Sequence, residues 1–179
     1  MDNRGAAQAA VERLFLAGHR KIGMIAGPEH VFTARERYLG YEEAFKKAGI
    51  EVQDSLVVHG DYTIAGGARA MKELAKQNPQ MTAVFVSNYE MTVGAMIESN
   101  EIGIRIPEDL SVIGFDNIEF AKASNPKLSI VTQPTKEIGR NVAELILDRL
   151  DNPTREMPPK EMKLKTSFVE GKSVHILSV

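Results

Sequence analysis

The feature that most constrains the fold of this chain is the stretch that ends at Asp116 and Asn117. Residues 112–115 form an unbroken apolar run, and the polar pair follows it directly. Such a run between polar residues is typical of a strand that is buried on both faces, as in a parallel sheet. Open parallel sheets bind ligands at the carboxyl ends of their strands. The polar pair is therefore a candidate ligand contact.

Other short apolar runs alternate with helical patterns along the chain, with short connections between them. This alternation predicts an α/β fold with a doubly wound parallel sheet. Asp2 or Asn3 is expected to cap the first helix, and Thr33 with Glu36 to form a capping box for the second. We expect strands at residues 21–26, 56–58, 82–86, 110–115, 128–132, 162–169 and 173–179, and helices at residues 6–17, 33–48, 63–75, 91–102 and 138–150.

Composition excludes several classes of function. The 179 residues carry a net charge of −2 and no cysteine, which gives no basic footprint for nucleic acid and no thiolate metal site. The four histidines lack metal-ligand spacing, and no phosphate loop, dinucleotide motif or nucleophile elbow occurs. No signal peptide or membrane span is visible. We therefore expect a cytoplasmic protein that has no catalytic residues, no cofactor, no metal and no membrane partner.

The residues that follow the predicted strands suit a polyol ligand. They are Arg35 or Arg37, Tyr62, Asn88 and Asp116. A carboxylate accepts hydrogen bonds from neighbouring hydroxyls, arginine donates a rigid fork, and a tyrosine ring can cover an apolar sugar face. The sequence thus predicts a site for a small polar molecule.

Each of these residues also has a purely structural interpretation. Asp116 could cap the following turn, and Asn88 could cap the following helix. Tyr62 could be ordinary packing, and the spacing of Arg35 and Arg37 allows only one of them to point inward. His19 is expected to be a capping or surface residue next to the helix stop at Gly18.

Four segments resemble the lactose-repressor/galactose-repressor (LacI/GalR) family. They are residues 18–23 (GHRKIG), 34–41 (ARERYLGY), 106–116 (IPEDLSVIGFD) and 129–134 (SIVTQP). The resemblance covers nearly the whole chain and implies a type I periplasmic-binding-protein-like core with the second lobe complete and the first lobe partial. It assigns residues 1–18 to a remnant of the amino-terminal lobe and 19–131 to the carboxyl-terminal effector-binding lobe. Residues 132–179 would form the crossover, a helix of the amino-terminal lobe and the terminal strands.

The family pattern also implies the ligand contacts. It selects Arg37 over Arg35, and it adds Tyr62, Asn88 and Asp116. Gln133 ranks below these because its spacing does not align with the family motif. The chain departs from the family after the third strand, where Tyr89-Glu90 follows Asn88 in place of the usual aspartate.

The resemblance implies the effector-sensing domain of a sugar-responsive transcriptional regulator. The effector would be a sugar or a sugar phosphate, ahead of a purine. The chain would form a homodimer. The parent regulator would bind DNA only through a helix-turn-helix headpiece that this chain lacks. Without the rest of the first lobe, helices 6–17 and 138–150 are expected to expose apolar faces. The alternatives are a periplasmic sugar-binding protein and an α/β enzyme that acts on a sugar phosphate.

Overall fold

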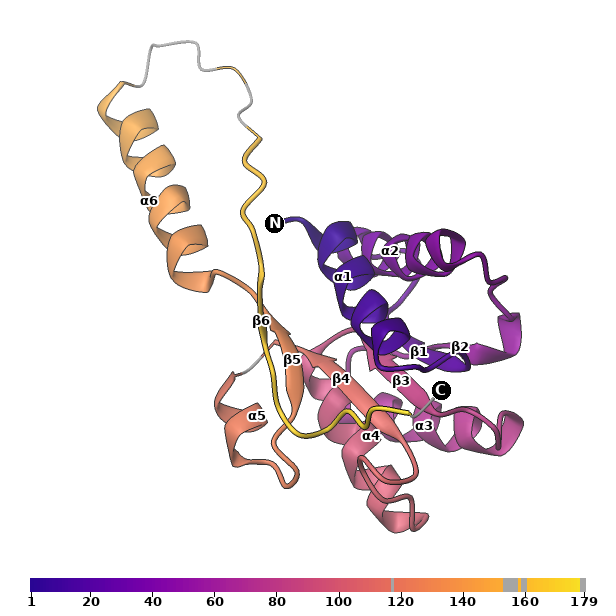
Figure 1. The fold of residues 1–179 in the computed structure, drawn as a ribbon. Helices are drawn as coiled ribbons and strands as arrows, with labels where there is room; N and C mark the ends of the chain where they lie inside the picture. The colour runs from indigo at the N-terminus through magenta and orange to yellow at the C-terminus, as the bar shows by residue number, and fades with distance from the viewer. Residues whose placement is uncertain (117, 153–157, 159–160, 178–179) are drawn as a thin grey trace.

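The fold is built on one six-stranded sheet with the strand order β2-β1-β3-β4-β5-β6 (Figure 1). The structure is a computed structural model that describes residues 1–116, 118–152, 158 and 161–177. The first five strands of the chain pair in parallel, and only β6 pairs antiparallel, with β5. The strands are β1 (Ile22–Ala26), β2 (Val57–His59), β3 (Ala83–Val86), β4 (Ser111–Phe115), β5 (Ser129–Thr132) and β6 (Ser167–Val169).

Helices cover both faces of this sheet (Figure 1). Side chains alternate across each strand, so Met24 faces α1 and α2 while its neighbour Ile25 faces α3 and α4. The doubly wound α/β fold predicted from the alternating pattern is confirmed. The helices are α1 (Asn3–Leu16), α2 (Phe32–Ala48), α3 (Ile64–Gln77), α4 (Tyr89–Glu101), α5 (Ile118–Ala123) and α6 (Thr135–Asp151), and a 3-10 turn, η1 (Asp54–Leu56), precedes β2.

The first helix packs differently from the sequence expectation. Ala7, Val11 and Leu14 of α1 are fully buried in one core with β1, β3, β4 and β5. The expectation that this helix exposes an apolar face is therefore wrong, because α2 and the sheet cover that face. The division of the chain into lobes at residues 18 and 131 stays a prediction.

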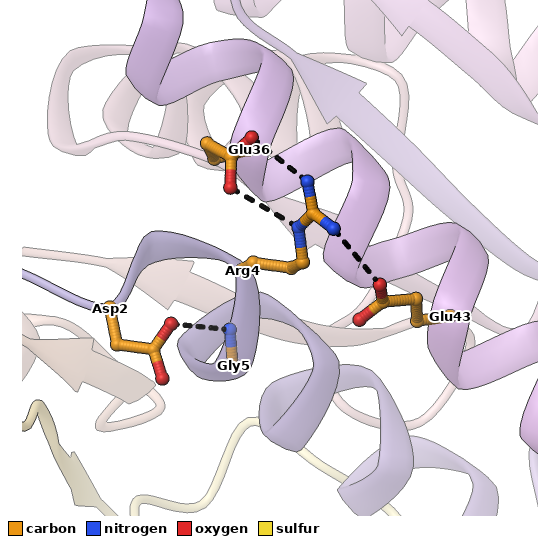
Figure 2. A network of polar contacts seen from close by, with 5 residues as sticks. All are labelled: Asp2, Arg4, Gly5, Glu36 and Glu43. Atoms are coloured by element: carbon orange, nitrogen blue, oxygen red, sulfur yellow. Dashed lines mark hydrogen bonds and ion pairs between the residues drawn. The ribbon is translucent and has the colours of Figure 1, made fainter.

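Arg4, near the start of α1, joins this helix to α2 (Figure 2). The Arg4 guanidinium donates to both carboxylate oxygens of Glu36, at 3.1 and 3.0 Å, and to Glu43 at 3.3 Å. Asp2 caps α1 by accepting from the Gly5 amide at 3.1 Å. Glu36 therefore binds another helix and is not part of a capping box.

The other predicted helix starts agree in part with the structure. Thr63 caps α3 by accepting from the Gly66 amide, as expected. In contrast, α2 starts at Phe32 with Val31 as its cap residue and without a side-chain cap. Thr33 therefore lies inside the helix, and the predicted capping box is wrong.

The carboxyl-terminal part of the chain leaves the sheet and returns to it. None of the α6 side chains is buried, and Figure 1 shows the helix standing away from both helical layers. The expected strand at 162–169 is limited to β6, and residues 173–177 form no strand. Instead, the carbonyl of Ser173 accepts from the Val112 amide, and the Leu177 amide donates to the carbonyl of Ala17, each at 2.8 Å. No helix in the described ranges is long and apolar enough to span a membrane.

Candidate functional site

Arg37 is the most deeply buried charged group at the carboxyl edge of the sheet. It lies on α2 and is only 5% exposed. Its Nε donates to Oδ1 of Asn3 at 3.0 Å, and one terminal nitrogen donates to the carbonyl of Ser87, just after β3. Its Cζ lies 3.8 Å from the centroid of the Phe115 ring, which is a cation–π contact. Burial lowers the Arg37 pKa, whereas the negative charge of Asp116 raises it.

Asp116 lies directly after β4 in a left-handed backbone conformation, with a φ of 67°. Aspartate tolerates this region better than most residues do. Burial raises the pKa of its carboxyl group, a hydrogen bond from Gln133 and the charge of Arg37 lower it, and the charge of Glu90 raises it. Asp116 therefore connects groups from α2, from the start of α4 and from the segment after β5.

Tyr62 lies at the same edge of the sheet, in the segment between β2 and α3. Its φ of 63° is also left-handed. The ring lies so close to Gly27 that a Cβ built on that glycine would be 2.3 Å from the Tyr62 Cε1 atom. The Tyr62 hydroxyl is buried and has no hydrogen-bond partner among the described residues. A buried unpaired hydroxyl is costly, so Tyr62 is an energetically unusual residue at this edge.

Asn88 caps α4, which was one of its two interpretations. Its Oδ1 accepts from the Met91 amide at 3.0 Å, and its Nδ2 donates to Glu90 at 2.6 Å. An amide nitrogen carries two donors, so one N–H of Asn88 is left for a ligand. The cap is thus confirmed, and the ligand contact stays a prediction.

Several residues near the strand ends do not join this group. The side chain of Arg35 is exposed and stacks over Phe32, so Arg37 alone of the two arginines points inward, as the spacing required. Asp61 is exposed and binds Thr63 and Arg69. Asn117 lies outside the described residues.

Three residues were missed by the sequence reasoning as members of the site. Asn3 and Ser87 hold Arg37, and Glu90 acts on Asp116. The departure at Glu90 was visible in the family pattern. Asn3 carried only the signal of a helix start, and Ser87 carried none, because its contact with Arg37 is made by the backbone.

His19 was expected to be a capping or surface residue. Its amide donates to the Leu14 carbonyl at the end of α1, as a capping residue does, but its side chain does not lie on the surface. It is fully buried, with Nδ1 3.0 Å from the Thr82 hydroxyl oxygen and Nε2 3.0 Å from the carbonyl oxygen of His175. The carbonyl can only accept, so Nε2 carries the proton. Burial lowers the pKa of the ring. Within the described part of the chain, no group of three His, Asp or Glu side chains could hold a metal ion.

Known proteins resemble this chain in sequence and in fold. Residues 11–174 match the family model described as a periplasmic binding protein-like domain. The HTH-type transcriptional regulator CelR of Thermobifida fusca is 38% identical over 173 residues, which are 97% of this chain and 50% of that regulator. The chain thus spans about half the length of this curated relative.

Solved structures agree with the sequence match. A CelR–cellobiose complex superposes with a TM-score of 0.90 at 38% identity, covering 97% of this chain and 52% of that one. A LacI family regulator from Enterococcus faecium with bound ribose gives a TM-score of 0.89 at 30% identity, covering 99% and 65%.

The fold and the match together define a periplasmic binding protein-like domain, and the chain belongs to that family. Its relatives and structural neighbours are transcriptional regulators of the LacI type. The resemblance to the LacI/GalR family found in the sequence motifs is therefore confirmed.

Proposed function

We propose that this chain is the effector-sensing region of a LacI/GalR-type DNA-binding regulator and that its effector is a sugar. The observation that carries the proposal is the convergence of Arg37, Asp116 and Gln133 at this edge, with Tyr62 near Arg37. The carboxylate can accept from two neighbouring sugar hydroxyls, and the guanidinium and amide can donate. Each charge-assisted hydrogen bond contributes about 1.5–3 kcal/mol, so a few of them suffice for micromolar binding.

We assign the ligand contacts to Arg37, Tyr62, Asn88, Asp116 and Gln133. The two structural neighbours bound to cellobiose and to ribose support a sugar as the effector. Because the relatives are regulators, binding would act by shifting a conformational equilibrium and not by chemistry. An enzyme or a periplasmic sugar carrier is the weaker alternative.

The remaining parts of the proposal concern partners and location. The regulator would act in the cytoplasm as a homodimer and bind DNA through a headpiece that is not among these 179 residues. We also propose that α1 belongs with the lobe of residues 19–131, since its buried face shares their core.

Thermal melting with a sugar panel tests the proposal. Cellobiose, ribose, glucose and adenosine are each added to the wild type, to Arg37→Ala and to Arg35→Ala. A ligand at 100 times its dissociation constant adds about 2.7 kcal/mol, which raises the melting temperature by about 5–10 °C. A selective shift that is lost in Arg37→Ala and kept in Arg35→Ala supports the site.

Arg35 is a matched control because it is exposed and lies two residues from Arg37 on the same helix. Gln133→Ala serves as a second site variant, since Gln133 is only partly buried and its loss leaves the core intact. A sugar that shifts the wild type and both site variants equally would place the ligand elsewhere and contradict the assignment.

A further inference from the structure

The charged side chains near Asp116 include more negative than positive groups. The charged groups that act on Asp116 from the described neighbouring elements are Arg37 on α2 and Glu90 on α4. One guanidinium thus stands against two carboxylates. These described groups carry a formal charge of −1, which the sequence motifs alone did not reveal.

Arg37 has little capacity left to compensate for an anionic ligand. Its Nε and one terminal nitrogen already donate to Asn3 and Ser87, and one face lies on Phe115. Its charge is also balanced by Asp116. Free N–H groups remain for a ligand hydroxyl, which needs a donor or an acceptor but no net positive charge.

Glu90 is an exposed acidic residue two positions after Asn88, one of the ligand contacts that we assign. It lies in the first turn of α4, and its carboxylate is held by the Asn88 amide nitrogen at 2.6 Å. Helix amino termini attract anions through their free N–H groups and the helix dipole. Here the cap of Asn88 already uses the Met91 amide, and Glu90 places a negative charge in the first turn of the helix.

We propose that Glu90 is a specificity-determining residue that restricts the effector to uncharged sugars and excludes sugar phosphates. The inference rests on the proposed sugar-sensing function and decides between two ligand classes that the sequence left open. A phosphate group would meet the carboxylates of Glu90 and Asp116 without a free cation in the described part of the site to offset them. A neutral sugar would meet only hydrogen-bonding partners.

Matched ligand pairs test this inference by calorimetry. Glucose is compared with glucose 6-phosphate, and ribose with ribose 5-phosphate, on the wild type, Glu90→Gln and Glu101→Gln. Glutamine keeps the size and the hydrogen-bonding oxygen of Glu90. Glu101 is an exposed carboxylate at the far end of the same helix, so its replacement changes the net charge equally.

We expect the wild type to prefer the uncharged member of each pair that binds. In Glu90→Gln the ratio of the two affinities should move about tenfold toward the phosphorylated sugar, and less so at high salt. Glu101→Gln should leave the ratio unchanged. A wild type that binds the phosphorylated member more tightly would overturn the inference, as would a ratio that Glu90→Gln does not move.

A second measurement tests the role of Glu90 without any sugar, so that it does not depend on the sugar-sensing proposal. Inorganic phosphate is titrated while the backbone amides of residues 89–91 are followed by NMR. Glu90→Gln should respond at a lower phosphate concentration than the wild type, and an identical response would overturn the role of Glu90. If no sugar binds at all, the sugar-sensing proposal fails, while the phosphate titration still decides the inference.

Discussion

The contact between α3 and α4 depends on glycines, and Gly94→Ala is the sharpest test of that packing. A Cβ at Gly94 would lie 1.9 Å from the carbonyl oxygen of Ile64 and 2.7 Å from the amide nitrogen of Ala68. Both atoms belong to the backbone of α3, so no side chain can rotate away. Real Cβ contacts essentially never fall below 3.0 Å, so the helices would have to separate by about 1 Å in a core that packs densely.

The expected magnitude follows from two opposing effects. Alanine is favoured over glycine inside a helix by about 1 kcal/mol. Overpacking costs about 1–3 kcal/mol, and a clash with fixed backbone belongs at or above the upper end of that range. We therefore expect a net loss of about 2 kcal/mol of unfolding free energy, or about 4–8 °C in melting temperature for a domain of this size.

Gly139→Ala provides the matched control for this experiment. Gly139 lies inside α6, and a Cβ there would meet nothing within 4 Å. The same substitution should raise helix content measured by circular dichroism and should not lower the melting temperature. A Gly94→Ala protein that melts at or above the wild-type temperature would refute the close helix contact.

Two further predictions concern stability and association. Because burial lowers the pKa of His19, the folded state favours its neutral ring. Stability should therefore fall as the pH drops below about 6.5, the usual pKa of histidine, and thermal melts at pH 7 and pH 5 should differ less in His19→Gln. On α6, Ile146, Leu147 and Leu150 are 53%, 58% and 70% exposed. Such a stripe promotes association, so Leu147→Lys should lower the sedimentation coefficient at high concentration, and an unchanged profile would contradict this role.

The central strands β1, β3 and β4 were predictable because they are buried on both faces. A strand of that kind is almost entirely apolar, so these three strands stand out as apolar runs, with Ser111 at the start of β4 as the polar exception. The same reasoning wrongly predicted a strand in the carboxyl-terminal segment. Residues 173–177 alternate in the manner of a strand, but they form no ladder. Ser173 accepts from the Val112 amide through its carbonyl and donates to the Val112 carbonyl through its hydroxyl, and the His175 amide donates to the Ser111 hydroxyl.

Short sequence patterns gave wrong predictions where residues distant in the sequence determine a side chain's contacts. Thr33 and Glu36 have the spacing of a capping box, yet the helix begins one residue before Thr33, and Glu36 pairs with Arg4. The apolar face of α1 was visible in the sequence, but not the helix and sheet that cover it. His19 stands next to the end of α1, and only the fold shows that residues 63 and 156 positions away are its partners.

The site shows the same division between local and distant information. The polar residues at the strand ends were predictable, since parallel strands bring their carboxyl ends to one edge. The environment of Arg37 was not, because Asn3 and Ser87 lie 34 and 50 positions away in the sequence. Asn3 lies on α1, next to the Asp2 amide that donates to the carbonyl of Leu164 at 3.2 Å. Because Asn3 holds Arg37, we expect a displacement of the start of α1 to move the guanidinium that we assign to the effector.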